Sequence, residues 1–192
     1  MTQKRARRVL LCVTGGYQSW ALPGFVLQLL HHFADDVQIV LTRAAAGLVS
    51  QQALEVASRN KVFVEMGDRS DEIYVPHIEL SRAADLILVY PATVSIVGKV
   101  ANGISDELVS ALVIAAEIPV FFVPISNPAM IAHPAMQRNM AQLRTDGYTV
   151  LPPMKATEVA TREGLDESTG PFPMPTLLLQ MSSALSRGQE KA

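Results

Sequence analysis

The amino-acid sequence predicts an α/β fold in which one parallel β-sheet carries helices on both of its faces. Short, continuous apolar runs alternate along the chain with stretches whose apolar residues recur at helical spacing. Continuous apolar runs are typical of strands buried on both faces, and their alternation with helices is typical of a parallel sheet. The 192 residues, 49% of them hydrophobic, are enough for one domain with a complete core. We therefore expect a single domain over residues 1–192.

The N-terminal part of the chain contains two predicted β-α units. The apolar run at 8–14 ends in Gly15-Gly16, and Trp20, Phe25 and Leu29 then recur at helical spacing as far as Phe33. A second apolar run at 37–41 ends at Thr42 and is followed by helix-compatible sequence at 44–58. Both units therefore pass from a buried strand through a short turn into a helix.

The same alternation continues to the C-terminus. Pro91 and Pro124 close two further apolar runs. The predicted strands are 85–90, 119–123 and 148–151, and the predicted helices are 94–101, 106–117, 133–146 and 177–185. Residues 152–175 are rich in Pro, Gly and charge and are expected to form a long loop, a kind of segment that is often functional. Together these elements predict one α/β domain with a parallel sheet flanked by helices.

Composition excludes several classes of partner. The formal net charge of −2 provides no broad basic surface for nucleic acid, and no apolar run approaches the roughly 20 residues that span a membrane. The single cysteine, Cys12, allows no intrachain disulfide and belongs to no metal-binding cluster. We expect Cys12 to be a small buried apolar residue of the first strand, and its isolation fits a reducing cytoplasm.

The carboxyl ends of the predicted strands are where a ligand should bind in such a sheet. The four longer strands end in Thr14-Gly15-Gly16, Thr42-Arg43, Pro91-Ala92-Thr93 with Ser95, and Pro124-Ile125-Ser126-Asn127. Hydroxyl groups and helix-start NH groups suit a phosphate monoester. Because the first turn lacks both G-x-G-x-x-G and a P-loop lysine, a mononucleotide fits better than a dinucleotide or triphosphate. The alternative is structural, with the glycines closing a tight turn and the hydroxyls capping helices.

The motifs between residues 77 and 152 together resemble the homo-oligomeric flavin-containing cysteine decarboxylases. This family includes phosphopantothenoylcysteine decarboxylase and the enzymes that decarboxylate the C-terminal cysteine of lanthipeptide and related precursor peptides. The matching segments are His77-Ile78-Glu79-Leu80, Pro91-Ala92-Thr93-Val94-Ser95-Ile96, Lys99 to Asp106, and Pro124-Ile125-Ser126-Asn127-Pro128-Ala129-Met130. Ser95, Ile96 and Ser126 depart from the family's Asn, Thr and Met, which affects the expected shape of the substrate site.

The resemblance implies a Rossmann-like, flavodoxin-like fold with FMN as cofactor. It also implies a trimer, or a dodecamer made of trimers, with active sites at subunit contacts. It implies that the cofactor-binding residues are Thr14, Gly15, Gly16, Ser19, Thr42, Pro91, Ala92, Thr93, Ser95 and Ser105. His77 would be the base that takes the thiol proton, while Asn127 would bind the substrate carboxylate and Met130 would pack beside it. Taken alone, His77 is more typical of a surface or hydrogen-bonded histidine than of a base, and Asn127 before Pro128 is a natural helix cap.

The substrate expected from the resemblance is the C-terminal cysteine of a ribosomally made precursor peptide, converted to an enethiol on the way to aminovinyl-cysteine. Bacterial phosphopantothenoylcysteine decarboxylases reduce the enethiol with a loop cysteine, and residues 164–170 contain none. The loop from Lys155 to Pro175 is expected to act as a clamp over the peptide.

Three alternatives stay open. The first is phosphopantothenoylcysteine, a small cysteine-containing acid, as the substrate in coenzyme A biosynthesis. The second is a flavin prenyltransferase, whose Pro-Arg-Glu-Thr-Pro segment is absent from this sequence. The third is a non-catalytic flavin-binding regulatory subunit, against which the presence of both His77 and Asn127 argues.

Overall fold

The computed structural model describes residues 6–70, 72–152, 154–155 and 174–189. Its strands are β1 (Ala6–Val13), β2 (Ala34–Leu41), β3 (Val62–Phe63), β4 (Leu86–Ala92), β5 (Val120–Ser126), β6 (Thr149–Val150) and β7 (Met154–Lys155). Its helices are the 3-10 helix η1 (Tyr17–Ala21), α1 (Leu22–His32), α2 (Arg43–Ala46), α3 (Gln51–Ser58), α4 (Pro76–Arg82), α5 (Val94–Ala101), α6 (Leu108–Ile114), α7 (Pro128–Ala132), α8 (Pro134–Thr145) and α9 (Met174–Gln189).

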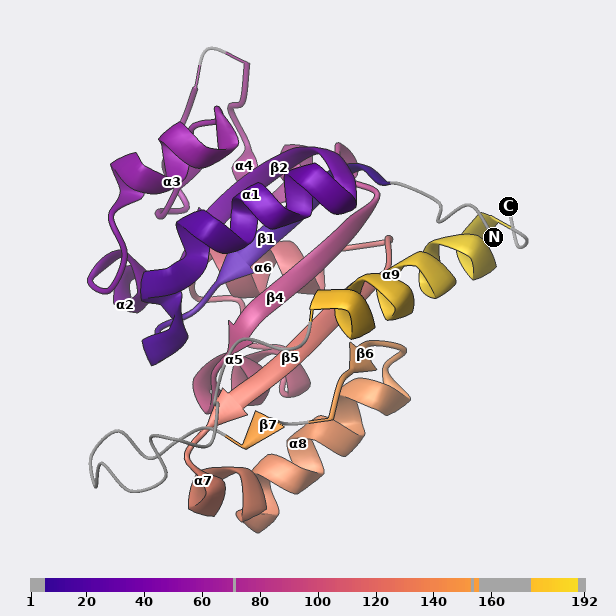
Figure 1. Cartoon of the computed structure of the whole chain (residues 1–192). Helices are drawn as coiled ribbons and strands as arrows, with labels where there is room; N and C mark the ends of the chain where they lie inside the picture. The colour runs from indigo at the N-terminus through magenta and orange to yellow at the C-terminus, as the bar shows by residue number, and fades with distance from the viewer. Residues whose placement is uncertain (1–5, 71, 153, 156–173, 190–192) are drawn as a thin grey trace.

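A parallel sheet in the order β3-β2-β1-β4-β5-β6 forms the centre of the domain, and β7 pairs in parallel with the end of β5. One core layer lies between the sheet and α1, α3 and α9, and it includes Phe25 stacked on Tyr90 with ring centroids 4.6 Å apart. The other lies between the sheet and α4, α5, α6 and α8. Figure 1 shows α1 and α9 in front of the sheet and α6 behind it. The predicted α/β architecture is therefore confirmed.

The helix boundaries differ from the predictions where capping residues act. The helix expected at 44–58 is divided into α2 and α3, because Thr42 and Ser50 each cap a separate helix start. The helix expected at 106–117 is shortened to α6, whose start is fixed by a capping box formed by Glu107 and Ser110. The sequence does not predict β3, α4 or β7, because segments this short carry little periodicity.

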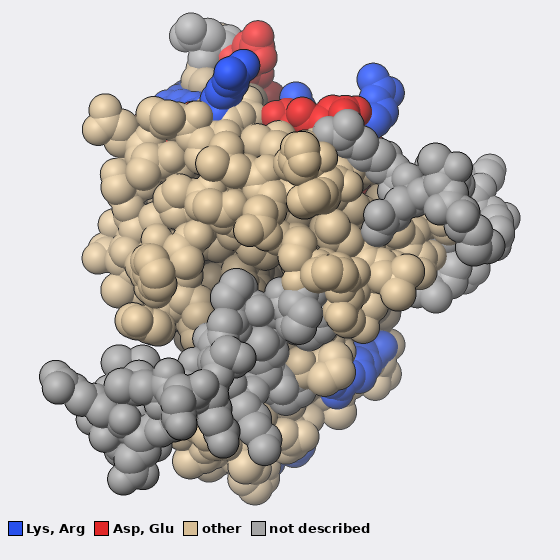
Figure 2. Space-filling view, viewed as in Figure 1, with Lys and Arg blue, Asp and Glu red and all other residues tan. Residues whose placement is uncertain are grey.

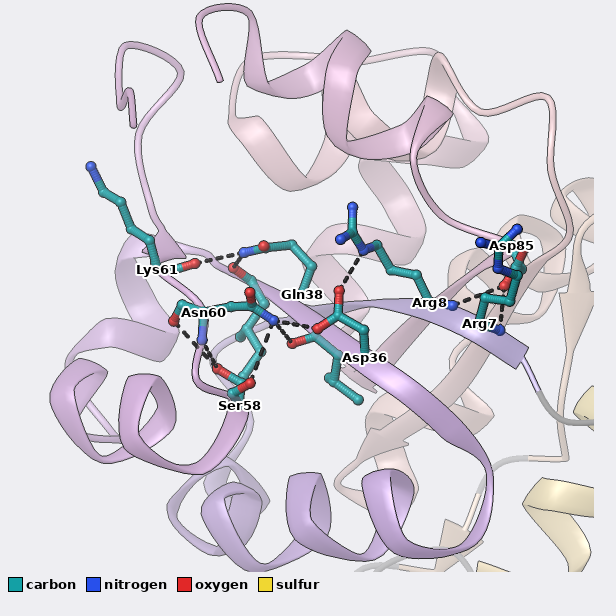
Figure 3. A network of polar contacts seen from close by, with 10 residues as sticks. Arg7, Arg8, Asp36, Gln38, Ser58, Asn60, Lys61 and Asp85 are labelled. Atoms are coloured by element: carbon teal, nitrogen blue, oxygen red, sulfur yellow. Dashed lines mark hydrogen bonds and ion pairs between the residues drawn. The ribbon is translucent and has the colours of Figure 1, made fainter. Parts of the chain in front are cut away.

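Polar contacts join the amino ends of the strands, as Figure 3 shows. The carboxylate of Asp36 accepts hydrogen bonds from Arg8 Nε and Asn60 Nδ2, both at 2.5 Å. One carboxylate oxygen of Asp85 accepts from the backbone NH groups of Arg7 and Arg8 at 2.6 and 2.8 Å. These contacts fasten the start of β1 to β2 and to the segment before β4. The side chains at the amino ends of the strands therefore hold neighbouring strands together.

In the described part of the chain, no helix is both long enough and apolar enough to cross a bilayer.

Candidate functional site

A cavity of about 900 Å³ lies at the carboxyl ends of β1, β2, β4 and β5. It is the place where an open parallel sheet binds its ligands. Eight residues predicted for the site line it: Thr14, Gly15, Gly16, Thr42, Thr93, Ser95, Asn127 and Met130. The structure therefore gathers around one cavity side chains that lie more than 100 residues apart in the sequence.

The hydroxyl of Thr14 joins the ends of β1 and β4. Thr14 Oγ1 donates to the carbonyl oxygen of Pro91 at 2.6 Å and accepts from the backbone NH of Thr93 at 3.1 Å. It also lies 3.0 Å from Thr93 Oγ1. Thr14 is 1% exposed, so these bonds satisfy a polar group that has lost its contact with water. This side chain fixes the spacing between the first turn and the start of α5.

The two glycines of the first turn bring three loops into contact. A Cβ atom at Gly15 would lie 2.5 Å from Cβ of Ala44, in the turn that follows β2. One at Gly16 would lie 2.7 Å from Cγ of Pro91, at the end of β4. Such distances are shorter than van der Waals contact, so a larger residue would push the loops apart.

Thr42 and Arg43 form the wall of the cavity that follows β2. Thr42 Oγ1 accepts from the backbone NH of Ala45 at 3.2 Å and caps α2. Arg43 makes a bidentate ion pair with Glu65, with Nε–Oε1 and Nη2–Oε2 distances of 2.5 and 2.8 Å. Hydrogen bonding to Glu65 raises the pKa of Arg43, and the same bond lowers the pKa of Glu65. The sequence does not predict Glu65 for the site, because it follows the undetected strand β3.

A lysine held between two carboxylates forms another part of the wall. Lys99 Nζ lies 2.9 Å from Oδ1 of Asp106 and 2.7 Å from Oε1 of Glu107, and all three residues line the cavity. Hydrogen bonds to Glu107 and then to Asp106 raise the pKa of Lys99, and Lys99 lowers the pKa of Asp106. The sequence predicts residues 99–106 only as part of a family motif. The sequence did contain a signal for this site: Lys99 near the end of the predicted helix, followed by the acidic pair Asp106-Glu107.

Asn127 and Met130 lie on the wall formed by the end of β5. Asn127 Oδ1 accepts from the backbone NH of Ala129 at 2.8 Å, so the capping role that its position before Pro128 suggests is present. Ser126 Oγ lies 3.3 Å from the sulfur of Met130, which is 50% exposed. Asn127 therefore both caps α7 and lines the cavity.

Other predicted residues lie outside the cavity lining. Ser19 is fully buried and donates to the carbonyl oxygen of Thr14 at 2.9 Å, so it supports the turn from behind. Pro91 contributes its carbonyl oxygen to Thr14, and Ala92 is buried within β4. Ser105 is exposed in the turn before α6. Ser19 and Pro91 thus support the cavity through their hydrogen bonds with Thr14.

His77 lies on α4, which packs against α6, and it is not among the residues that line the cavity. Its Nδ1 atom is buried, and no described residue forms a hydrogen bond with it. In the loop expected at 152–175, Pro152 is exposed and Met154–Lys155 forms β7, which pairs with Ile125 and Ser126 on the cavity wall. Residues 174 and 175, also expected in this loop, instead begin α9. Residues 156–173 of the clamp lie outside the described residues.

The site suits a phosphorylated mononucleotide. Thr93 is the N-cap residue of α5, but its side chain makes no capping hydrogen bond. The first turn of α5 lines the cavity, so its backbone NH groups can bind an anion there. The volume admits a molecule larger than a phosphate ion. Among the residues that the structure describes, no three His, Cys, Asp or Glu side chains are grouped to hold a metal ion.

Known proteins match both the sequence and the fold. The model of the family described as Flavoprotein matches residues 1–185. The mouse phosphopantothenoylcysteine decarboxylase is 35% identical over 168 residues, which are 85% of this chain and 81% of the mouse protein. The coenzyme A biosynthesis bifunctional protein CoaBC of Bacillus subtilis is 36% identical over 150 residues, which are 77% of this chain. The chain spans only 36% of the length of CoaBC.

Two solved structures are similar over most of the fold. The FMN-dependent cysteine decarboxylase SpaF has a TM-score of 0.78 and 30% identity, and the alignment covers 94% of this chain and 96% of SpaF. The FMN-dependent cysteine decarboxylase TvaF from thioviridamide biosynthesis has a TM-score of 0.70 and 33% identity, with 77% and 90% covered.

The close approach at Gly15 leads to a prediction. Gly15→Ala should lower the thermal stability by about 1–3 kcal/mol and weaken retention of a bound mononucleotide, because the added methyl group displaces the first turn from Ala44. Thermal melting and quantification of released nucleotide measure both effects. Gly67→Ala is the matched control, since its Cβ would meet nothing within 4 Å. Equal behaviour of the two variants would contradict the packing argument.

Burial of Cys12 leads to a second prediction. Burial raises the pKa of the Cys12 thiol, and the residue is 0% exposed in β1. Iodoacetamide at pH 8 should therefore leave the folded protein unmodified and alkylate it completely in denaturant. Mass spectrometry distinguishes the two, and rapid alkylation of the folded protein would show that the thiol is accessible.

Proposed function

The chain belongs to the Flavoprotein family of flavin-dependent cysteine decarboxylases, and on this basis we propose that it binds FMN and oxidatively decarboxylates the C-terminal cysteine of a precursor peptide. The observation that carries the choice of product is the burial of Cys12, the single cysteine of the 192 residues. No other thiol of this sequence can return electrons to the product. The enzyme therefore stops at the enethiol.

The strand ends provide the cofactor site in this proposal. The phosphate would bind at Thr14-Gly15-Gly16, Thr42 and the start of α5, where backbone NH groups and hydroxyls gather. When bound, FMN accepts a hydride from the cysteine Cβ, which is the step that side chains cannot perform. The protein's own part is to fix the geometry and to move the thiol proton.

The reaction balances with one base and one hydride acceptor. His77 takes the proton of the cysteine thiol, and removal of hydride from Cβ leaves a thioaldehyde. The carboxylate is then β to a C=S group, so its C–C bond electrons pass to sulfur as CO2 leaves. Protonation of the enethiolate gives the enethiol. The amide of Asn127 would hold the departing carboxylate, and Met130 would pack beside it.

The position of His77 supports a site completed by a neighbouring subunit. His77 lies on α4, while Asn127 and Met130 line the cavity at the end of β5. A base must come within hydrogen-bond reach of the thiol, and His77 is absent from the cavity lining of its own chain. The homo-oligomer implied by the resemblance would bring His77 of one copy to the cavity of another.

The charges of the cavity favour a peptide over a phosphorylated substrate. Its two cationic side chains, Arg43 and Lys99, are each paired with carboxylates. FMN already places one phosphate in the cavity, and a second phosphate would bring two further negative charges toward those carboxylates. A peptide brings a single C-terminal carboxylate.

We place the enzyme in the cytoplasm, where a lone thiol remains reduced.

A second candidate function is the decarboxylation of phosphopantothenoylcysteine in coenzyme A biosynthesis. The 35% identity to the mouse phosphopantothenoylcysteine decarboxylase favours it. In that case a reductant from outside this sequence would complete the reaction.

Separate incubation with the two substrates decides between these functions. A peptide that ends in cysteine should lose the mass of CO2 plus two hydrogens, roughly 46 Da, with FMN as the hydride acceptor. Phosphopantothenoylcysteine should remain unchanged. Mass spectrometry measures both, and turnover of phosphopantothenoylcysteine alone would overturn the proposed substrate.

Replacement of the proposed base gives a further prediction. His77→Asn should lower the decarboxylation rate by about 10²–10⁴-fold, because the thiol loses its proton acceptor, while FMN stays bound. His133→Asn is the control: His133 is exposed and caps α8 through Nδ1, a role that Asn performs equally well. A His77→Asn variant that is yellow and has the wild-type rate would rule His77 out as the base.

A further inference from the structure

Two methionine side chains on the wall of the cavity are open to solvent. Met66 and Met130 line the cavity and are 40% and 50% exposed. Met130 belongs to α7, a helix in which no residue is buried. By contrast, Met136, Met140 and Met181 are 1%, 2% and 0% exposed. The cavity therefore offers two accessible thioether groups, while these three methionines of the core are shielded.

The sulfur atom of Met130 lies beside a hydroxyl group. Ser126 Oγ is 3.3 Å from Met130 Sδ, and both residues line the cavity. A thioether sulfur is only a weak hydrogen-bond acceptor, whereas oxidation of methionine to the sulfoxide makes the side chain polar. The hydroxyl of Ser126 would therefore bind the sulfoxide oxygen more strongly than it binds the thioether. Ser126 is thus placed to stabilise an oxidised Met130.

The thiol of the chain is protected, in contrast to these thioethers. Cys12 is 0% exposed, and burial raises its pKa, so the reactive thiolate is scarce. Figure 2 shows the charged side chains gathered at the margins of one face of the molecule. Because hydrogen peroxide is uncharged, such charges do not steer it, and the exposure of each sulfur atom decides where it reacts. Oxidation is therefore expected at the cavity methionines before Cys12.

We propose that Met130 is a site of oxidative modification, at which hydrogen peroxide converts the thioether to a sulfoxide and thereby weakens binding of the substrate. A lone pair of the sulfur forms a bond to one peroxide oxygen as the O–O bond breaks, and the other oxygen leaves as water with both protons. The sulfur loses the two electrons that the peroxide gains. The effect on the substrate rests on the proposed function, in which Met130 packs beside the cysteine, because a polar sulfoxide replaces an apolar contact there.

Hydrogen peroxide has two sources at this cavity. Under the proposed function, dioxygen takes two electrons and two protons from the reduced flavin and becomes hydrogen peroxide, which is released into the cavity that Met130 lines. The same oxidant also enters from the solvent. The chemistry at the sulfur is identical in both cases.

Peptide mapping by mass spectrometry tests the site after the flavin-loaded protein has been treated with hydrogen peroxide. The two cavity methionines should gain one oxygen atom at least about tenfold faster than the three buried ones, because oxidation follows the exposure of the sulfur. In denaturant all five should react at similar rates. Equal rates in the folded protein, or a Met130 that stays unmodified while the buried methionines react, would overturn the proposal.

Met130→Leu tests the consequence for binding, since leucine has a similar volume and forms no sulfoxide. Peroxide treatment should raise the KM of the wild type for a peptide ending in cysteine by about fivefold or more, with a smaller change in kcat. Methionine sulfoxide reductases should reverse this rise. The KM of Met130→Leu should be the same before and after treatment, while Met66→Leu, the matched control, should respond as the wild type does. A rise in Met130→Leu equal to that of the wild type would contradict the effect on binding.

Turnover of the peptide in air separates the two sources of peroxide. Sulfoxide at Met130 that forms during turnover and is suppressed by catalase comes from the enzyme's own reaction, whereas sulfoxide that requires added peroxide comes from the solvent. Failure to release CO2 from the peptide contradicts the proposed function, and the mapping still decides whether Met130 is modified. Release of CO2 from a protein whose Met130 resists added peroxide contradicts the modification alone.

Discussion

The contact between the first turn and the ends of β2 and β4 is the constraint on which the rest of the site depends. Gly15 and Gly16 approach Ala44 and Pro91 closely, and the hydroxyl of Thr14 spans from β1 to β4. Parallel strands carry their connections away to opposite faces, which opens a crevice at their carboxyl ends. Small residues allow the loops around that crevice to approach one another until they are in van der Waals contact. The cavity is consequently shaped by backbone more than by long side chains.

The strand ends could be predicted because each follows an apolar run that is buried on both faces. Thr14, Thr42 and Thr93 were placed in this way, and all three line the cavity. Glu65 could not be placed, because the strand before it is only two residues long. The position of His77 relative to the cavity depends on how α4 packs against α6, which local periodicity does not encode. The start of α6 required the hydrogen bonds of Glu107 and Ser110 to be known.

The electrostatics of the cavity and the burial of Cys12 both bear on the substrate and the product of the proposed reaction. Arg43 and Lys99 are both held by carboxylates, so the cavity offers limited compensation for additional phosphate charge. Cys12 is buried within β1 and its pKa is raised by that burial, so it is unsuited to redox exchange with a product. Both observations favour a peptide substrate and an oxidised product. The likeness to SpaF and TvaF, two FMN-dependent cysteine decarboxylases, agrees with membership of the cysteine decarboxylase family.

An anaerobic single-turnover experiment tests most directly whether the reaction ends with the electrons on the flavin. Purified flavin-loaded protein is mixed without oxygen with excess peptide ending in cysteine, and the visible absorbance of the flavin is followed together with released CO2. We expect the flavin to bleach completely, with one CO2 formed per flavin, and to regain its colour when air is admitted. Repeated release of CO2 from a flavin that stays oxidised without oxygen would contradict the claim.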